Sequence, residues 1–235
     1  MPRPTAIVLA ILVAFLVANA WLGRRRFARW LALREGNPAA LDAFYLRLIV
    51  GTWVLGLSVP LTLVVSPELS PADIGLRWPE PTVVGYGLAA YTGAVLYWGA
   101  RGRRRRLMSG RVDLPSHIRA ILPVTTKQRW LVVGLSFTAG IVEEAVFRGL
   151  LIAGGVALGL SVYAAAALSL VLFAWGHVYQ GRAGVIGALT FGFVFTALFL
   201  ITGSLLFPII LHVAQDIVAF LLTPAVTSIN IFERI

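Results

Sequence analysis

The stretch Trp130–Leu151, WLVVGLSFTAGIVEEAVFRGLL, decides the fold because it is long and apolar enough to cross a lipid bilayer. Its exceptions are two adjacent glutamates and an arginine, which lie inside the apolar run rather than at its ends. A charged side chain costs about 3 kcal/mol or more at the centre of a membrane, so its helix is expected to face protein instead of lipid. The stretch therefore predicts a membrane helix in the interior of a bundle.

Comparable apolar runs lie on both sides of this stretch: Thr5–Leu22, Phe44–Val65, Thr82–Ala100, Ser161–Tyr179, Gly184–Ile201 and Ser204–Leu222. Hydrophobic residues make up 59% of the 235 residues and charged residues only 13%, a composition unlike that of a soluble domain. We therefore predict an all-α fold, a polytopic membrane bundle of about seven transmembrane helices.

Positive charge follows the apolar runs and predicts their orientation. The net charge is +10, and arginine clusters at 24–34 and 101–129 directly follow apolar runs, as is typical of cytoplasmic loops. We expect no nucleic-acid partner, because no nucleic-acid-binding motif accompanies these clusters. The N-terminus is then outside, and Thr5–Leu22 is expected to be a retained helix rather than a cleaved signal peptide. The preference for arginine over lysine suggests a bacterial protein, and hence a multi-pass protein of the plasma membrane.

The chain is expected to divide into three parts. Residues 1–129 hold N-terminal helices with basic loops, 130–222 form a catalytic helical core, and 223–235 form a tail. The glycine-rich segment 150–160 is either a helix end or a re-entrant piece. There is no cysteine, which excludes disulfides and a thiol nucleophile.

Polar residues gather in the predicted core. They are Glu143, Glu144, Arg148, His177, His212 and Asp216. Glu144 and Arg148 are four positions apart, so they are neighbours on one helix face and neutralise each other. Glu143 is turned about 100° away, which leaves it free to act as a general base.

The remaining members of this set also lie four positions apart on their helices. Phe173 precedes His177 at this spacing, and His212 precedes Asp216. Residues on three helices can converge to activate water and stabilise an oxyanion, or to bind a metal such as zinc. A transporter or proton relay, or a non-catalytic immunity or scaffold protein, would also account for them. We expect no functional role for His117, which lies in the basic loop.

Three motifs occur in order: E-E-x-x-x-R at 143–148, F-x-x-x-H at 173–177 and H-x-x-x-D at 212–216. Over residues 130–222 the chain thereby resembles the CAAX-protease and bacteriocin-processing family, also called the Abi family. The resemblance implies an intramembrane endopeptidase that is entered from the cytoplasm. Eukaryotic members remove the last three residues of prenylated proteins. The implied partners are membrane lipid and a peptide or protein substrate, either lipidated or embedded in the membrane.

The resemblance also assigns roles to the polar residues. Glu143 would activate the attacking water with the help of His177. His212 and Asp216 would hold the oxyanion or orient the water, while the structural support comes from Glu144, Arg148 and Phe173. No cofactor is certain; if a metal is bound, its ligands are Glu143, His177, His212 and Asp216.

One geometric condition remains open. Glu143 lies roughly 20 Å along its helix from Trp130, whereas His177 is predicted near the cytoplasmic end of another helix. The two meet only if the Glu143 helix begins in the cytoplasm, is tilted, or is broken near Gly140.

Overall fold

A computed structural model describes residues 4–34, 37, 39–111 and 114–223, and these form helices and connecting turns without a β-strand. The α-helices and two short helices of other types are α1 (Pro4–Arg34), α2 (Ala39–Gly56), α3 (Ser58–Val65), α4 (Val83–Met108), α5 (Ser116–Ala120), α6 (Thr126–Glu143), η1 (Glu144–Leu150), α7 (Leu151–Ala157), α8 (Val162–Gly176), η2 (Val178–Gln180), α9 (Gly181–Thr202) and α10 (Leu206–Leu221). The predicted all-α bundle is confirmed. The predicted tail lies outside the described residues, apart from Thr223.

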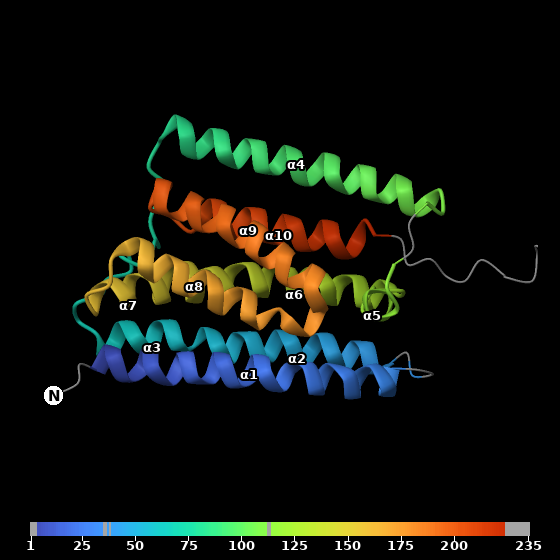
Figure 1. The fold of residues 1–235 in the computed structure, drawn as a ribbon, viewed down its shortest axis with the longest axis horizontal. Helices are drawn as coiled ribbons and strands as arrows, with labels where there is room; N and C mark the ends of the chain where they lie inside the picture. The colour runs from blue at the N-terminus through green and yellow to red at the C-terminus, as the bar shows by residue number, and fades with distance from the viewer. Residues whose placement is uncertain (1–3, 35–36, 38, 112–113, 224–235) are drawn as a thin grey trace, which may run out of the picture.

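The long helices lie side by side along one axis (Figure 1). The helix α4 lies on one outer side, α1 and the α2–α3 rod lie on the opposite side, and α6 to α10 lie between them. The helix α6 packs against both α2 and α10. The predicted catalytic helices therefore occupy the interior of the bundle.

Four helical rods are long and apolar enough to cross a membrane: Pro4–Arg34, Ala39–Val65, Thr126–Ala157 and Val178–Thr202. The other predicted spans are helices as well. The helices α8 and α10 are apolar but shorter, and α4 ends in a run of arginines. The chain is thus a multi-pass membrane protein.

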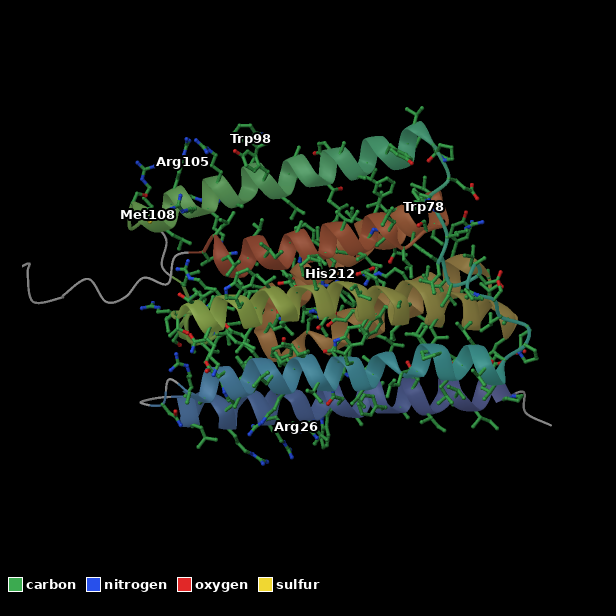
Figure 2. The ribbon with its side chains drawn as sticks, turned by 180° about the vertical axis from the view of Figure 1, so that it is seen from behind. Arg26, Trp78, Trp98, Arg105, Met108 and His212 are labelled. Carbon is green, nitrogen blue, oxygen red and sulfur yellow. The ribbon has the colours of Figure 1, made fainter. Side chains whose placement is uncertain are left out.

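The two ends of the bundle differ in charge. Arg105 lies near the end that also holds α5, whereas Trp78 lies near the opposite end and His212 lies midway between them (Figure 2). The last turn of α1, with Arg34, and the last turn of α4, with Arg105 and Arg106, extend toward the same end (Figure 1). This arrangement matches the sidedness expected from the positions of the basic clusters.

The helix that carries the glutamates is longer than predicted. It begins at Thr126, because Thr125 and Gln128 form a capping box in which each side chain bonds the other residue's backbone N–H. It stays helical to Ala157, so the segment expected to be a helix end or a re-entrant piece continues the rod. The turn to α8 follows at Gly159, whose φ of +96° favours glycine.

The same rod changes its winding at the glutamates. Residues Glu144–Leu150 form a π-helix, which is wider than an α-helix and recurs at functional sites. Gly149 in this segment lies against the loop between α3 and α4, residues 66–82, which we call the outer loop. An added Cβ at Gly149 would meet the Ile74 carbonyl oxygen of this loop at 2.8 Å. Ile74 is itself fully buried. The outer loop therefore packs directly on the widened turn.

Candidate active site

Glu144 and Arg148 form an ion pair inside the bundle. Arg148 Nη1 lies 3.0 Å from Glu144 Oε1, and the two side chains are 1% and 0% exposed. Both residues lie in the π-helical turn, and their spacing of four positions is the spacing quoted from the sequence. Burial removes both groups from water, so each depends on the other to balance its charge.

The guanidinium of Arg148 has further partners on α8 and α9. Its Nη2 donates to the Gly192 carbonyl oxygen at 3.1 Å and its Nε to Thr196 Oγ1 at 3.4 Å. Its Cζ lies 4.2 Å from the centroid of the Phe173 ring. A Cβ at position 192 would lie 3.0 Å from Nη2, so glycine leaves room for this approach. Arg148 thus joins three helices at one point.

Glu144 also accepts a hydrogen bond from His212, a contact that the sequence did not predict. His212 Nδ1 lies 2.7 Å from Glu144 Oε1, and the imidazole is almost fully buried. The bond joins positions 68 residues apart, so only the packing of α10 against the glutamate helix creates it. The Glu144 carboxylate therefore contacts the Arg148 guanidinium and the His212 imidazole at the same time.

The other ring nitrogen of His212 faces Asp216. The Nε2–Oδ2 distance is 4.0 Å, which is beyond hydrogen-bond length. The Phe195 ring stacks on the imidazole at 5.6 Å, and the Phe173 ring meets it edge-on at 6.2 Å. Two aromatic rings therefore fix the plane of His212, and Nε2 remains available to a ligand.

His177 lies at the end of α8, which stops well inside the bundle. The helix turns into α9 before it reaches the end that holds α5 (Figure 1). His177 Nδ1 is 2.8 Å from the Phe173 carbonyl oxygen, and the two rings lie 4.6 Å apart. Of the alternatives named for the glutamate helix, an early start is the one observed, because α6 begins at Thr126. The glutamate helix begins at the basic end and continues unbroken past Gly140.

One cavity brings several of the predicted residues together. It has a volume of about 470 Å³ and opens between α4, α9 and α10. Phe173, His177, His212 and Asp216 line it, while the Glu144–Arg148 pair lies buried behind His212. Glu143 is half-buried and is not among its described lining residues.

The alternative of a metal site requires a closer grouping of ligands. Among the residues that the structure describes, no three His, Asp or Glu side chains are grouped so that they could hold a metal ion. The set named for a metal, Glu143, His177, His212 and Asp216, is therefore not arranged as one.

Sequence analysis did not identify several residues that build this site. Gly192, Thr196 and Phe195 on α9 hold Arg148 and His212. Their only trace in the sequence is a spacing of three to four positions on one helix, which is equally typical of ordinary packing.

Comparison with known proteins bears on the same region. Residues 125–218 match the family model described as type II CAAX prenyl endopeptidase Rce1-like. No curated protein and no solved structure was found to match the chain. The match begins at the Thr125 cap and extends over all three motifs, whereas the residues of α4 that line the cavity lie outside it. The resemblance to CAAX-type proteases predicted from these motifs is therefore confirmed for residues 125–218.

Proposed function

We propose that this chain is an endopeptidase of a bacterial plasma membrane that hydrolyses a peptide bond near the end of a lipidated or membrane-embedded substrate. The observation that carries the proposal is a single cavity lined by His177, His212 and Asp216 and backed by the buried Glu144–Arg148 pair. All five residues lie within the segment that matches the CAAX-type family. A hydrolase of this kind needs a base for water, for which we propose Glu143 beside this set, and a donor for the oxyanion, for which we propose His212.

The first step of the proposed reaction is attack by water. Glu143, assisted by His177, removes a proton from a water molecule as its oxygen bonds to the peptide carbonyl carbon. The electron pair of the C=O bond moves to the carbonyl oxygen, which becomes the oxyanion. The proton stays on the Glu143 carboxyl group until the carbon–nitrogen bond breaks. It then passes to the leaving amine, so that atoms and charge balance.

His212 is the proposed oxyanion donor. Its Nδ1 donates to Glu144 and its ring is held by Phe195 and Phe173, so an Nε2–H in the imidazolium form points into the cavity. Glu144 balances that positive charge while Arg148 fixes the carboxylate. Asp216 is too far from Nε2 to take its proton, and we assign it a role in orienting the water or the ring. Preorganised donors of this type need no rearrangement during the reaction.

The proposal is tested by Glu143→Gln in protein reconstituted into liposomes with a farnesylated peptide. Mass spectrometry measures the released peptide. We expect kcat to fall roughly 10²–10⁴-fold, because the base is lost. Glu80→Gln, in an exposed ion pair of the outer loop, is the matched control and retains activity. Cleavage that persists in folded Glu143→Gln protein contradicts the mechanism. Proton-coupled flux in sealed liposomes that is lost in the same variant would instead identify a transporter.

A further inference from the structure

The outer loop contacts both helical rods that carry the buried glutamate–histidine bond. Two consecutive carbonyl oxygens of the loop make these contacts. The Ile74 oxygen lies against Gly149 of the π-helical turn. The Gly75 oxygen accepts a hydrogen bond at 3.0 Å from the N–H of Leu205, which directly precedes α10. The loop therefore bridges the glutamate helix and the histidine helix at the end of the bundle marked by Trp78, opposite the basic end (Figure 2).

The conformation of Gly75 allows one short segment to make both contacts. Its φ of +78° lies in the region that favours glycine. An added Cβ there would lie 2.5 Å from a ring carbon of Phe199 and 3.2 Å from Leu205 Cγ. The loop is thus packed against α9 as well as the start of α10, and it cannot shift without displacing them.

The side chain and the backbone of Arg77 hold the turn between α9 and α10. The Arg77 Nε donates to the Gly203 carbonyl oxygen at 2.8 Å. The Arg77 carbonyl oxygen accepts a hydrogen bond from Ser204 Oγ at 2.6 Å, and Ser204 Oγ accepts one from the Leu206 N–H at 3.2 Å. The first N–H groups of an α-helix have no partner within the helix, so these bonds cap the start of α10.

His212 lies on the same face of α10 as the capped start of the helix. It follows Leu205 by seven positions, which is about two helical turns and roughly 10 Å along the axis. In the glutamate helix, Gly149 lies about one π-helical turn after Glu144. The loop thus holds one point near each partner of the contact between His212 Nδ1 and Glu144 Oε1, whose length is 2.7 Å.

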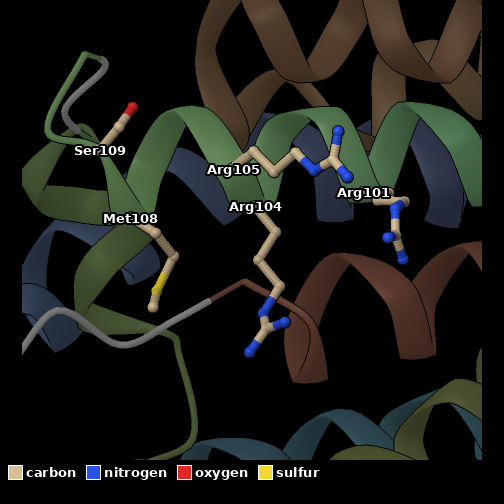
Figure 3. Close-up of a pocket in the computed structure, with 5 residues that line it drawn as sticks. All are labelled: Arg101, Arg104, Arg105, Met108 and Ser109. Atoms are coloured by element: carbon tan, nitrogen blue, oxygen red, sulfur yellow. The ribbon is translucent and has the colours of Figure 1, made fainter.

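Arg77 differs from the arginines at the basic end of the bundle. Three exposed arginines of α4 line a surface hollow of about 410 Å³: Arg101, Arg104 and Arg105 (Figure 3). The Arg77 side chain instead reaches across to the turn before α10. It also pairs with Glu80 at 3.1 Å, but the two side chains are 46% and 59% exposed, so the pair contributes little. The bond from Nε to Gly203 is therefore the side-chain contact of Arg77 that holds the helices.

On the basis of the proposed function, we propose that the outer loop holds His212 in the position that oxyanion stabilisation requires, with Arg77 as the positioning residue. Arg77 is not among the described residues that line the cavity, so it acts through α10 and not on the substrate. Small displacements of a catalytic group cost large factors in rate, because the donor must meet the oxyanion at hydrogen-bond distance. Residues 74–80 lie outside the segment that matches the CAAX-type family, and they complete its site from the N-terminal half of the chain.

The experiment compares Arg77→Met with Arg77→Gln, which differ in one hydrogen-bond donor. Both remove the charge and with it the ion pair to Glu80. Gln places an amide N–H near the position of the arginine Nε and can still donate to Gly203, whereas Met fills the same space without a donor. Arg105→Met is the control at the basic end. Each protein is measured for kcat and KM with a farnesylated peptide in liposomes, for thermal unfolding, and by ¹⁵N NMR of labelled histidine, of which the chain has three.

In Arg77→Met we expect kcat to fall roughly tenfold with KM unchanged, because the oxyanion donor moves while the cavity keeps its lining. The His212 imidazole signals, assigned by substituting the other two histidines, should shift, because the hydrogen bond to Glu144 changes. Arg77→Gln and Arg105→Met should keep the kcat and the His212 signals of wild type. A purely structural role would lower the unfolding temperature of Arg77→Met but leave kcat and the His212 signals of the folded protein unchanged.

Wild-type kcat and His212 signals in folded Arg77→Met overturn the inference and leave the protease assignment intact. Equal changes in Arg77→Met and Arg77→Gln assign the effect to the charge and also overturn it. If Arg77→Met does not fold, it is replaced by Ser204→Ala, which lacks the bond to the Arg77 carbonyl oxygen and carries the same expectations.

If none of the proteins, including wild type, cleaves the peptide, the His212 signals decide. A shift in Arg77→Met that is absent in Arg77→Gln supports the positioning by the outer loop although the proposed function fails. The lack of a shift in both variants contradicts the positioning and the proposed function together.

Discussion

Two membrane-crossing rods of this protein, Ala39–Val65 and Thr126–Ala157, differ in what surrounds them. In the most apolar part of the first rod 11% of the residues are buried, against 56% in the second. The first rod is also the more apolar of the two, although it is the less buried. In a membrane this order is physically sensible, because lipid is as apolar as the side chains that face it. The less apolar rod is the one that the other helices shield from lipid.

Ion pairs at the surface and in the interior of the bundle differ in the same way. The Lys127–Asp42 pair at the basic end has a distance of 2.8 Å, and its lysine side chain is 70% exposed. The Glu144–Arg148 pair is 3.0 Å long and almost completely buried. The outer rods therefore stabilise the protein by covering the bundle, whereas the inner rod depends on a few polar contacts. The predictions below test that difference.

The largest effect on kcat among these predictions is expected from a substitution of His212. His212→Asn keeps an N–H near the position of Nδ1, and so a donor to Glu144, but removes Nε2. We expect kcat to fall roughly 10²–10³-fold with little change in thermal stability, because an oxyanion donor is lost. His117→Asn in α5 should leave kcat unchanged. Full activity of folded His212→Asn would limit this histidine to a structural role.

The ion pairs should differ in their effect on stability. Arg148→Ala leaves Glu144 buried without its cation and should lower the free energy of unfolding by about 3–5 kcal/mol. Lys127→Ala should cost less than about 1 kcal/mol, because its partner Asp42 stays hydrated near the membrane surface. Denaturation in detergent, followed by circular dichroism, measures both. Similar losses in the two variants would contradict the distinction between the exposed and the buried ion pair.

Glycines in the two rods should respond with opposite signs. A Cβ at Gly140 would meet a Val213 methyl at 2.5 Å and the Val213 backbone nitrogen at 3.2 Å. Gly140→Ala should therefore destabilise the protein by about 1–3 kcal/mol and displace His212, which precedes Val213. Gly51→Ala has no neighbour within 4 Å and should stabilise α2 by about 0.5–1 kcal/mol. Stabilisation by both changes would show that α6 and α10 do not pack closely at Gly140.

The smallest effect concerns a bond between the two rods. Trp53 Nε1 donates to Thr138 Oγ1 at 3.1 Å. A double-mutant cycle with Trp53→Phe and Thr138→Val should give a coupling energy of about 0.6 kcal/mol, the size typical of hydrogen bonds between membrane helices. A coupling above about 2 kcal/mol would mean that the outer rod also depends on specific polar contacts.

The sequence predicted the features that depend on local spacing. The apolar runs predicted the helices, and Glu144 and Arg148 were placed on one helix face by their separation of four positions. The start of α6 was predicted four residues late, at Trp130 instead of Thr126, although Thr125 and Gln128 carry a capping-box pattern. This capping-box pattern marks the start of α6 locally.

Other features of the site could not be predicted from local sequence patterns. The His212–Glu144 bond joins positions 68 apart, and the contact of Arg148 with Gly192 joins positions 44 apart. Such contacts depend on which helices become neighbours, and membrane helices carry no spacing that specifies a partner. The π-helical turn at Glu144–Leu150 likewise has no sequence pattern of its own. The roles of Glu143, His177, His212 and Asp216 remain predictions.

The shortness of α8 and α10 has a consequence for the membrane itself. These helices contain 15 and 16 residues, which corresponds to about 22–24 Å along their axes. A typical hydrocarbon layer is about 30 Å thick, so lipid beside them must thin or headgroups must bend inward. Such hydrophobic mismatch would shorten the distance through the membrane that the proposed lipid-anchored substrate crosses before it reaches His177. We therefore expect bilayer thickness to affect the proposed cleavage, which should be faster in membranes of shorter-chain lipids.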